Sequence, residues 1–309
     1  MEMAFTAQDV KTLRERTGVG MMDCKKALTE SGGDMDKAID ILREKGLAAA
    51  AKKSGRIAAE GMVYATVDEA KKVGVVVEVN AETDFVAKNA DFQQFVKDVA
   101  SVIIEKNPSD VEALLALPFS DTMSVADALR DKILVIGENI SIRRFVRYEG
   151  DCVAYVHGGG RIGVLVRFEA DDKAAGSEEL KECGKDVAMQ IAALNAAYLD
   201  KGVVPADAME KEKEILIAQI KNDPKNASKP EAIIHKMVEG RMGKFYENNC
   251  LMQQAYVKNG DQTVEQYVAE MAKKAGGTMK VVEYVRFEKG EGLQKREDNF
   301  AEEVASMMK

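Results

Sequence analysis

The sequence predicts an α+β fold made of two related halves, each a small antiparallel sheet covered by helices. The first observation is the run Val73–Val79, which has valine at every second position, the period of a half-buried strand. The second is the run over residues 92–103, whose apolar residues recur with the 3.6-residue period of a helix. The third is the likeness of residues 144–150 to residues 284–290, which indicates an internal duplication. The apolar residues of the helical run are Phe92, Phe95, Val96, Val99 and Ile103.

Size and composition limit the classes of protein that fit. A chain of 309 residues is long enough for about two domains, and its 31% charged and 46% apolar residues are typical of a globular protein. No apolar run is long enough to cross a membrane, and the first residues lack the pattern of a signal peptide, so we expect a cytoplasmic protein. The net charge of −8 disfavours binding to nucleic-acid phosphates. The four cysteines are widely spaced, which predicts neither a zinc site nor a disulfide framework.

Residues 1–46 predict a separate domain of three short helices that resembles the ubiquitin-associated fold. Glycines separate the helices, and Gly46 is expected to end the third. So small a domain has a small core, so apolar side chains near Met21 and Met22 are costly to expose unless a partner covers them. Residues 47–60 favour helix but have little to bury, and we interpret them as a linker.

The remaining patterns divide the core into subdomains at residues 61–149 and 150–288. Asn89 or Asp91 is expected to cap the helix after the valine strand. Further helices are predicted from Ser124 to Gly137, around residues 180–194, and after a capping box formed by Thr263 and Gln266. Further strands are predicted at residues 140–148, 162–168 and 279–288.

A helical hairpin at about residues 206–246 interrupts the second subdomain. Its two helical stretches flank a segment with two prolines, residues 222–230. The pattern fits a simple surface excursion as well as a binding module. The residues expected to share its inner faces are Met209, Leu216 and Ile220, and then Ile233, Met237 and Gly240.

The chemistry-bearing residues do not assemble into an enzyme motif. His157 and His235 are the only histidines and lie far apart in the sequence. The glycines at 158–160 precede a predicted strand, not a helix, so they predict a turn and not a phosphate-binding loop. The sequence therefore predicts no catalytic residues, no metal site and no cofactor, and favours a protein that acts by binding another protein.

The polar corner after the valine strand is the most informative segment. The strand is expected to stop at Asn80, and Thr83, Asp84 and Phe85 then place an acid and an aromatic ring at the edge of the sheet. In one interpretation these side chains contact a partner. In the other, Thr83 caps a helical turn and the Phe85 ring folds back onto the core.

Two long stretches resemble the signatures of the elongation factor Ts family, the guanine-nucleotide exchange factors of bacterial and organellar translation. The similarity runs through the whole chain, with weaker stretches at Ile136–Arg144, His157–Val166 and the C-terminus. Ala81 is a small departure from the family pattern. The stretches are Leu13-Arg14-Glu15-Arg16-Thr17-Gly18-Val19-Gly20-Met21-Met22-Asp23-Cys24-Lys25-Lys26-Ala27-Leu28 and Glu78-Val79-Asn80-Ala81-Glu82-Thr83-Asp84-Phe85-Val86-Ala87-Lys88.

The resemblance implies a partner, the GTPase elongation factor Tu, and a set of contact residues. Asp84 and Phe85, with Thr83 and Val86 beside them, are expected to approach the partner's Mg²⁺ site and promote GDP release. The resemblance also implies that the hairpin is a coiled-coil module for subunit or partner contact, and that residues 289–309 form a C-terminal helical module. The other implied contacts are Leu13, Met21, Met22, Ile136 and His157, and Phe300, Val304 and Met307 in the C-terminal module.

Two rival functions are compatible with an acidic binding protein of this size. One is a general protein-binding scaffold or chaperone of the translation machinery. The other is an RNA-associated translation protein, which the acidic balance and the lack of interleaved aromatic and basic residues disfavour.

Overall fold

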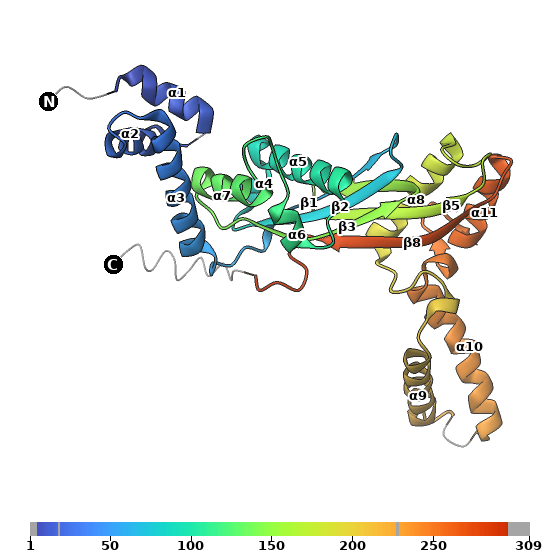
Figure 1. Cartoon of the computed structure of the whole chain (residues 1–309). Coiled ribbons are helices and arrows are strands. Elements are labelled where there is room, and N and C mark those ends of the chain that lie inside the picture. The colour runs from blue at the N-terminus through green and yellow to red at the C-terminus, as the bar shows by residue number, and fades with distance from the viewer. Residues whose placement is uncertain (1–4, 18, 227–228, 296–309) are drawn as a thin grey trace.

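The structure, a computed structural model, describes residues 5–17, 19–226 and 229–295. It is a mixed α+β protein, as predicted, with helices on an elongated core of strands (Figure 1). The α-helices are α1 (Ala7–Thr17), α2 (Met21–Glu30), α3 (Met35–Lys53), α4 (Asp84–Ala87), α5 (Ala90–Lys106), α6 (Val111–Ala116), α7 (Val125–Ile136), α8 (Glu178–Leu194), α9 (Ala206–Asn222), α10 (Glu231–Asn249) and α11 (Val264–Lys274). The strands are β1 (Glu60–Asp68), β2 (Val73–Ala81), β3 (Ser141–Glu149), β4 (Asp151–His157), β5 (Ile162–Ala170), β6 (Ala255–Tyr256), β7 (Asn259–Thr263) and β8 (Met279–Glu288).

The three N-terminal helices form a small domain with its own core, as the sequence predicts. The prediction that Gly46 ends the third helix is wrong, because α3 continues to Lys53. Gly46 lies where α3 packs on α7, and a Cβ atom there would be 3.8 Å from the Arg130 carbonyl oxygen. The alanines after Gly46 favour helix. The expected linker is therefore partly helical, and α3 connects the domain directly to the first subdomain.

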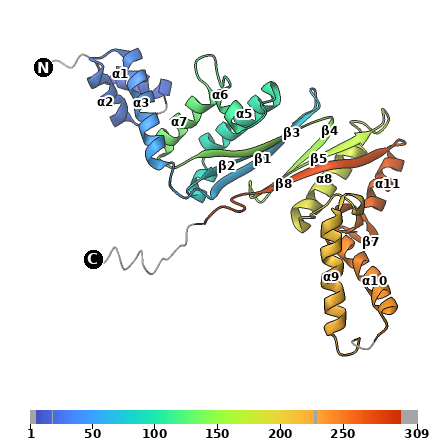
Figure 2. The same cartoon turned by 60° about the horizontal axis from the view of Figure 1, so that its bottom comes forward.

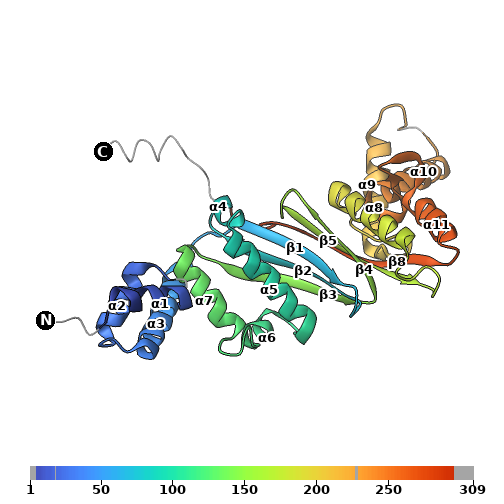
Figure 3. The same ribbon diagram turned by 90° about the horizontal axis from the view of Figure 1, so that it is seen from above.

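The core consists of two halves with matching elements. Each half has a three-stranded antiparallel sheet, ordered β1-β2-β3 in the first and β4-β5-β8 in the second. In each, the middle strand leads to a helix of 17 residues that ends at an asparagine with positive φ, Asn107 or Asn195. In each, a helix with a capping box, α7 or α11, precedes the last strand. Figure 3 shows α5 and α7 lying along the first sheet.

Strand pairing gives the correspondence between the halves. Val79 pairs with Ile142 in the first sheet and Phe168 with Val281 in the second, each directly after an irregularity in register. The likeness between residues 144–150 and 284–290 therefore reflects equivalent ends of β3 and β8.

The two sheets pack against each other, so β2 is buried along its whole length. The prediction of a half-buried strand is therefore wrong: Val75, Val77 and Val79 face the helices, while Val76 packs toward the second sheet. The close approach requires glycine at two equivalent positions. A Cβ atom on Gly74 would lie 2.6 Å from Leu165, and one on Gly163 would overlap Val63.

The hairpin α9–α10 projects from the second subdomain (Figure 2). Leu216 and Ile220 are buried on α9, as predicted, with Met209 partly buried. On α10 the prediction is right for Met237, which is partly buried against the hairpin core, and wrong for Ile233 and Gly240, which are exposed. The α10 side chains that are buried are Ile234, Val238 and Met242.

Besides the short pair β6 and β7, two strands of the main sheets lie where no strand was predicted, β1 and β4. Both contain polar or small residues among their apolar ones and lie on the outside of their sheets. They come together where the sheets meet. At the C-terminal end the structure describes turns up to Lys295. The predicted contacts Phe300, Val304 and Met307 lie outside the described residues.

Candidate protein-interaction site

The corner after β2 presents an aromatic side chain to solvent. The chain leaves β2 at Ala81 and forms the one-turn helix α4, in which Val86 is buried in the core of the first half. Phe85, on the other side of the turn, is 77% exposed. The interpretation in which the ring folds back onto the core is therefore wrong. Thr83 occupies the N-cap position of α4 but makes no side-chain cap hydrogen bond.

Asp84 and Lys88 flank the exposed ring. Lys88 Nζ donates a hydrogen bond to Asp84 Oδ2 at 2.7 Å and lies 5.8 Å from the centroid of the Phe85 ring. This hydrogen bond and the positive charge of Lys88 hold the pKa of Asp84 below its ordinary value. Both side chains are half exposed or more, so a partner can compete for the carboxylate.

Two carboxylates hold this corner in place. Glu138, directly after α7, accepts hydrogen bonds from the backbone N–H groups of Glu82 and Thr83, both at 3.0 Å, and from the Thr83 hydroxyl at 2.6 Å. Glu82 accepts one from the backbone N–H of Asn139 at 2.6 Å and pairs with Arg56 at 3.3 Å. Backbone and carboxylate groups thus connect the segments 82–83 and 138–139 in both directions.

His157 is the last residue of β4, and the turn that follows it lies at the same end of the first sheet. His157 is exposed, and the Tyr155 hydroxyl lies 2.9 Å from its Nδ1. The Gly160 carbonyl accepts a hydrogen bond at 2.8 Å from Val63, which pairs with Glu78 near the end of β2. The predicted contact His157 is therefore brought near the corner that carries Phe85.

The segment after β8 is also bound here. Glu78 is fully buried and accepts a hydrogen bond from the backbone N–H of Gly290 at 2.8 Å. The same carboxylate pairs with Arg143 at 3.1 Å and Arg144 at 2.6 Å. The backbone at Gly290 is thereby fixed to β2 near the end of the strand that leads to this corner.

The predicted contacts in the N-terminal domain differ in exposure. Met21 and Met22 are 53% and 64% exposed at the start of α2. Leu13 is fully buried in the core of the domain, so in this structure it supports the surface without being part of it. Ile136, the last residue of α7, is partly buried against the core of the first half and lies two residues before Glu138.

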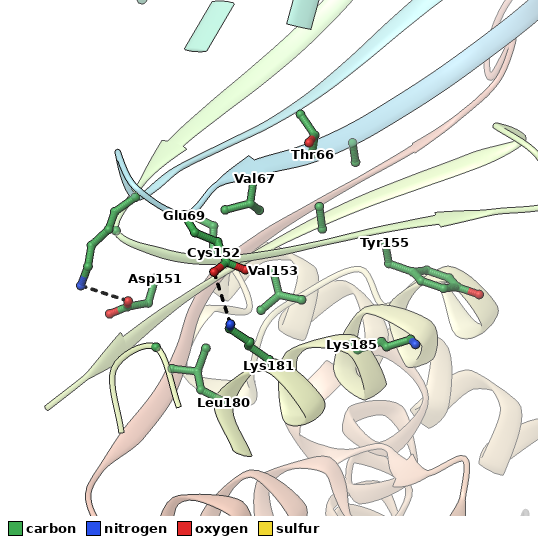
Figure 4. Close-up of a pocket in the computed structure, with 15 residues that line it drawn as sticks. Thr66, Val67, Glu69, Asp151, Cys152, Val153, Tyr155, Leu180, Lys181 and Lys185 are labelled. Carbon is green, nitrogen blue, oxygen red and sulfur yellow. Dashed lines mark hydrogen bonds and ion pairs between the residues drawn. The ribbon is translucent and has the colours of Figure 1, made fainter. Parts of the chain in front are cut away.

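A cavity of about 500 Å³ lies elsewhere, between β1, β4 and α8 (Figure 4). Its lysines Lys72 and Lys181 pair with Asp151 at 3.2 Å and Glu69 at 3.3 Å. Burial raises the pKa of the Cys152 thiol in this cavity to about 11, so the thiol stays protonated and poorly reactive. The residues around this cavity therefore do not include an activated nucleophile.

The described part of the chain lacks both a cluster of metal ligands and a membrane-spanning helix. Within residues 5–17, 19–226 and 229–295, no three His, Cys, Asp or Glu side chains are grouped so that they could hold a metal ion. No helix in that part of the chain has both the length and the apolar character needed to span a membrane.

Comparison with known proteins assigns the chain to a family. The sequence model described as "Elongation factor TS" matches residues 82–291. This chain belongs to the elongation factor Ts family. It is 50% identical over 307 residues to "Elongation factor Ts" of Clostridium botulinum (strain Eklund 17B / Type B), covering 98% of this chain and 99% of that protein. It is 52% identical over 305 residues to "Elongation factor Ts" of Clostridium kluyveri (strain ATCC 8527), covering 97% of each. Family membership supports a role in translation elongation.

Sequence reasoning missed the residues that hold the site. Glu82 and Glu138 are adjacent only in the folded chain and belong to no local pattern. The one available signal for Glu138 is its place directly after Gly137, the left-handed end of α7. An acid following a helix end is common on protein surfaces, so this signal does not point to a distant loop.

Proposed function

We propose that this chain is a guanine-nucleotide exchange factor that binds GDP-bound elongation factor Tu and promotes GDP release. The observation that carries this proposal is the Phe85 ring, 77% exposed on a turn that hydrogen bonds hold in place. An exposed aromatic side chain on a rigid turn is costly without a partner, and it resembles the residues that dominate binding at protein interfaces.

The mechanism is thermodynamic linkage. The factor binds the nucleotide-free GTPase more tightly than the GDP-bound form, so factor and nucleotide weaken each other's binding by the same ratio. The factor then speeds release without shifting the overall nucleotide equilibrium. No catalytic residue of this chain is required, and its chemistry is that of a binding protein.

Phe85 and Asp84 have separate parts in this mechanism. The ring enters the partner's nucleotide-binding domain and separates its helices, because it fills a pocket with little loss of side-chain entropy. Asp84 exchanges its bond with Lys88 for contacts near the partner's Mg²⁺ site and disturbs the magnesium shell. Thr83 and Val86 hold the turn, the first through Glu138 and the second through the core.

The remaining predicted contacts extend this surface. Met21 and Met22, supported by Leu13, cover part of the same domain of the partner. Ile136 and His157 add contacts from the two halves, and the C-terminal segment adds further contacts with the partner. The hairpin α9–α10 serves contact with the partner or with a second copy of this chain. Such a factor acts in the cytoplasm, with no nucleic acid bound directly.

Stopped-flow release of fluorescent GDP from elongation factor Tu tests the proposal. Phe85→Ala is expected to lose about 2 kcal/mol of productive interaction, roughly a 30-fold fall in kcat/KM. Val257→Ala, which shortens an exposed side chain of the second half, is the matched control and should release GDP at the wild-type rate. A Phe85→Ala variant as fast as wild type would remove the ring from the mechanism.

A further inference from the structure

The two halves of the core share one hydrogen bond at the end of their middle strand and differ in a second carboxylate. In the first half, the Glu82 carboxylate accepts a hydrogen bond from the backbone N–H of Asn139 at 2.6 Å. In the second, the Asp171 carboxylate accepts one from the backbone N–H of Thr278 at 2.8 Å. Strand register makes these bonds equivalent, because each acid directly follows its middle strand and each donor lies just before the last strand. One carboxylate–backbone bond is therefore common to both halves.

The second carboxylate is present in the first half alone. Glu138 precedes Asn139, whereas Gly277 precedes Thr278. A Cβ atom on Gly277 would overlap the Asp171 carboxylate, so no side chain fits there. The loop after β5 instead closes on itself, with Asp171 accepting hydrogen bonds from the backbone N–H groups of Lys173 and Ala174, both at 3.1 Å.

We infer that Glu138 is a positioning residue that fixes α4 so that Phe85 is held outward before any partner arrives. Its three hydrogen bonds satisfy two backbone N–H groups next to α4 and the Thr83 hydroxyl. A carboxylate acceptor makes such bonds stronger than neutral ones. Without them, α4 is a single turn anchored mainly by Val86, and one turn of helix is unstable alone.

The position of Glu138 also connects the two proposed binding surfaces. It follows α7, whose Leu134 packs against the core of the three-helix domain and lies beside Gly46 of α3. The Lys53 ammonium, at the end of α3, donates a hydrogen bond to the Ile133 carbonyl at 3.4 Å. Helix α7 thus packs against the domain that carries Met21 and Met22. Through Glu138, which follows it, α7 is also connected to the turn that carries Phe85.

The use of this positioning in exchange rests on the proposed function, but the positioning itself can be measured without a partner. The chain has no tryptophan, so Phe85→Trp places a single fluorescent reporter at the site. Time-resolved anisotropy of this reporter should show little sub-nanosecond motion with Glu138 intact. Glu138→Gln keeps the shape but removes the charge and one acceptor oxygen, so a fast component should appear at the expense of the slow one.

Two further variants make the anisotropy result decisive. Thr83→Val removes the hydroxyl donor with Glu138 in place and should give a smaller change in the same direction. Glu112→Gln changes an exposed acid on α6 and should change nothing. Unchanged anisotropy in both Glu138→Gln and Thr83→Val overturns the inference.

The concentration dependence of GDP release, with Phe85 in place, separates positioning from direct contact. For Glu138→Gln the half-saturating concentration should rise roughly tenfold, the change for one lost hydrogen bond to a charged group, while the maximal rate is retained because the bound partner orders the turn. A fall in maximal rate at unchanged half-saturation contradicts a positioning role. A mobile ring with both kinetic constants unchanged supports the positioning but shows that exchange does not use it. Failure of the wild-type chain to speed GDP release overturns the proposed function and leaves the anisotropy result standing.

Discussion

The loop after β2 and the loop after β5 occupy equivalent places in the two halves but differ in whether they expose an apolar side chain. Both follow the middle strand of a three-stranded sheet, and both lead to a 17-residue helix. The first exposes the Phe85 ring, whereas the second buries its apolar residue, Ala174. A shared fold can therefore present an exposed aromatic ring in one copy and a closed loop in the other, because a few side chains decide which way the loop turns.

Polar groups are also distributed differently between the halves. The buried residues of α5 are all apolar, whereas α8 buries Asp186 and Gln190. Asp186 accepts hydrogen bonds from Tyr256 at 2.5 Å, Tyr267 at 2.9 Å and Lys258 at 2.6 Å. Apart from buried Glu78 on β2, the first half has its carboxylate network at the exposed loop, whereas the second has one on the buried face of α8. The comparison predicts that polar substitutions in the exposed loop of the first half affect binding, whereas those on the buried face of α8 affect stability.

The largest expected effect is on stability in the second half. Asp186→Ala leaves two buried tyrosine hydroxyls without their acceptor, so the free energy of unfolding should fall by about 3 kcal/mol in urea denaturation. Asp98→Ala on α5 removes a surface hydrogen bond with Gln94 and should cost about 0.5 kcal/mol or less. Equal losses of unfolding free energy in Asp186→Ala and Asp98→Ala would contradict the contrast between α8 and α5.

Asp186 also predicts a dependence on pH. Burial raises its pKa, but the hydrogen bonds from Lys258, Tyr256 and Tyr267 outweigh burial, so the net pKa is lowered. A lowered pKa in the folded state stabilises the protein above the unfolded pKa of about 4, and this contribution is lost as the pH falls through the folded value. Asp186→Asn should therefore flatten the acid limb of the stability curve, and an unchanged acid limb would contradict this account.

A smaller effect is expected where the halves are alike. Gly74→Ala and Gly163→Ala each place a methyl group into the contact between the sheets and should each lower the free energy of unfolding by about 2 kcal/mol. Gly240→Ala is the matched control, because it lies in α10 with open space around it, and should stabilise by about 0.5 kcal/mol. A loss confined to one of the two core variants would show that the halves do not share this interface equally.

The smallest effect concerns the exposed loop itself. Lys88→Met removes the hydrogen bond and the charge that lower the pKa of Asp84, so this pKa should rise toward its ordinary value. NMR titration of the Asp84 carboxylate measures the change. Overall stability should hardly differ, since both groups lie at the surface. An unchanged pKa would mean that the pair is not formed in solution.

Periodicity predicted most of the fold. It identified β2, α5 and β8 because these elements have regular apolar patterns. Ser124 was correctly placed at the start of α7, and the capping box of Thr263 and Gln266 located the start of α11. It missed the burial of β2 on both faces, because the second sheet that covers β2 lies far away in the sequence. It also missed β1 and β4, whose partners alone make them strands.

The candidate site was predicted in part. The sequence shows an acid, Asp84, and an aromatic ring, Phe85, just after a strand and next to Thr83. The Phe85 ring is exposed. Their supporting groups could not be predicted, since Glu138 reaches Thr83 only through the packing of α7 on the first sheet. Leu13 lies with Val10 in the apolar stripe of the first helix, and both are buried, whereas its role as a partner contact came from the family resemblance alone.

Site-specific photo-crosslinking tests the central claim most directly. A benzoylphenylalanine at position 85 should crosslink to the nucleotide-binding domain of elongation factor Tu, and excess GDP with Mg²⁺ should suppress the crosslink because nucleotide and factor oppose each other. The same probe at position 257 should give no such product. The account would be contradicted if position 85 gave no crosslink, if the crosslink mapped to another domain, or if it persisted unchanged in excess GDP.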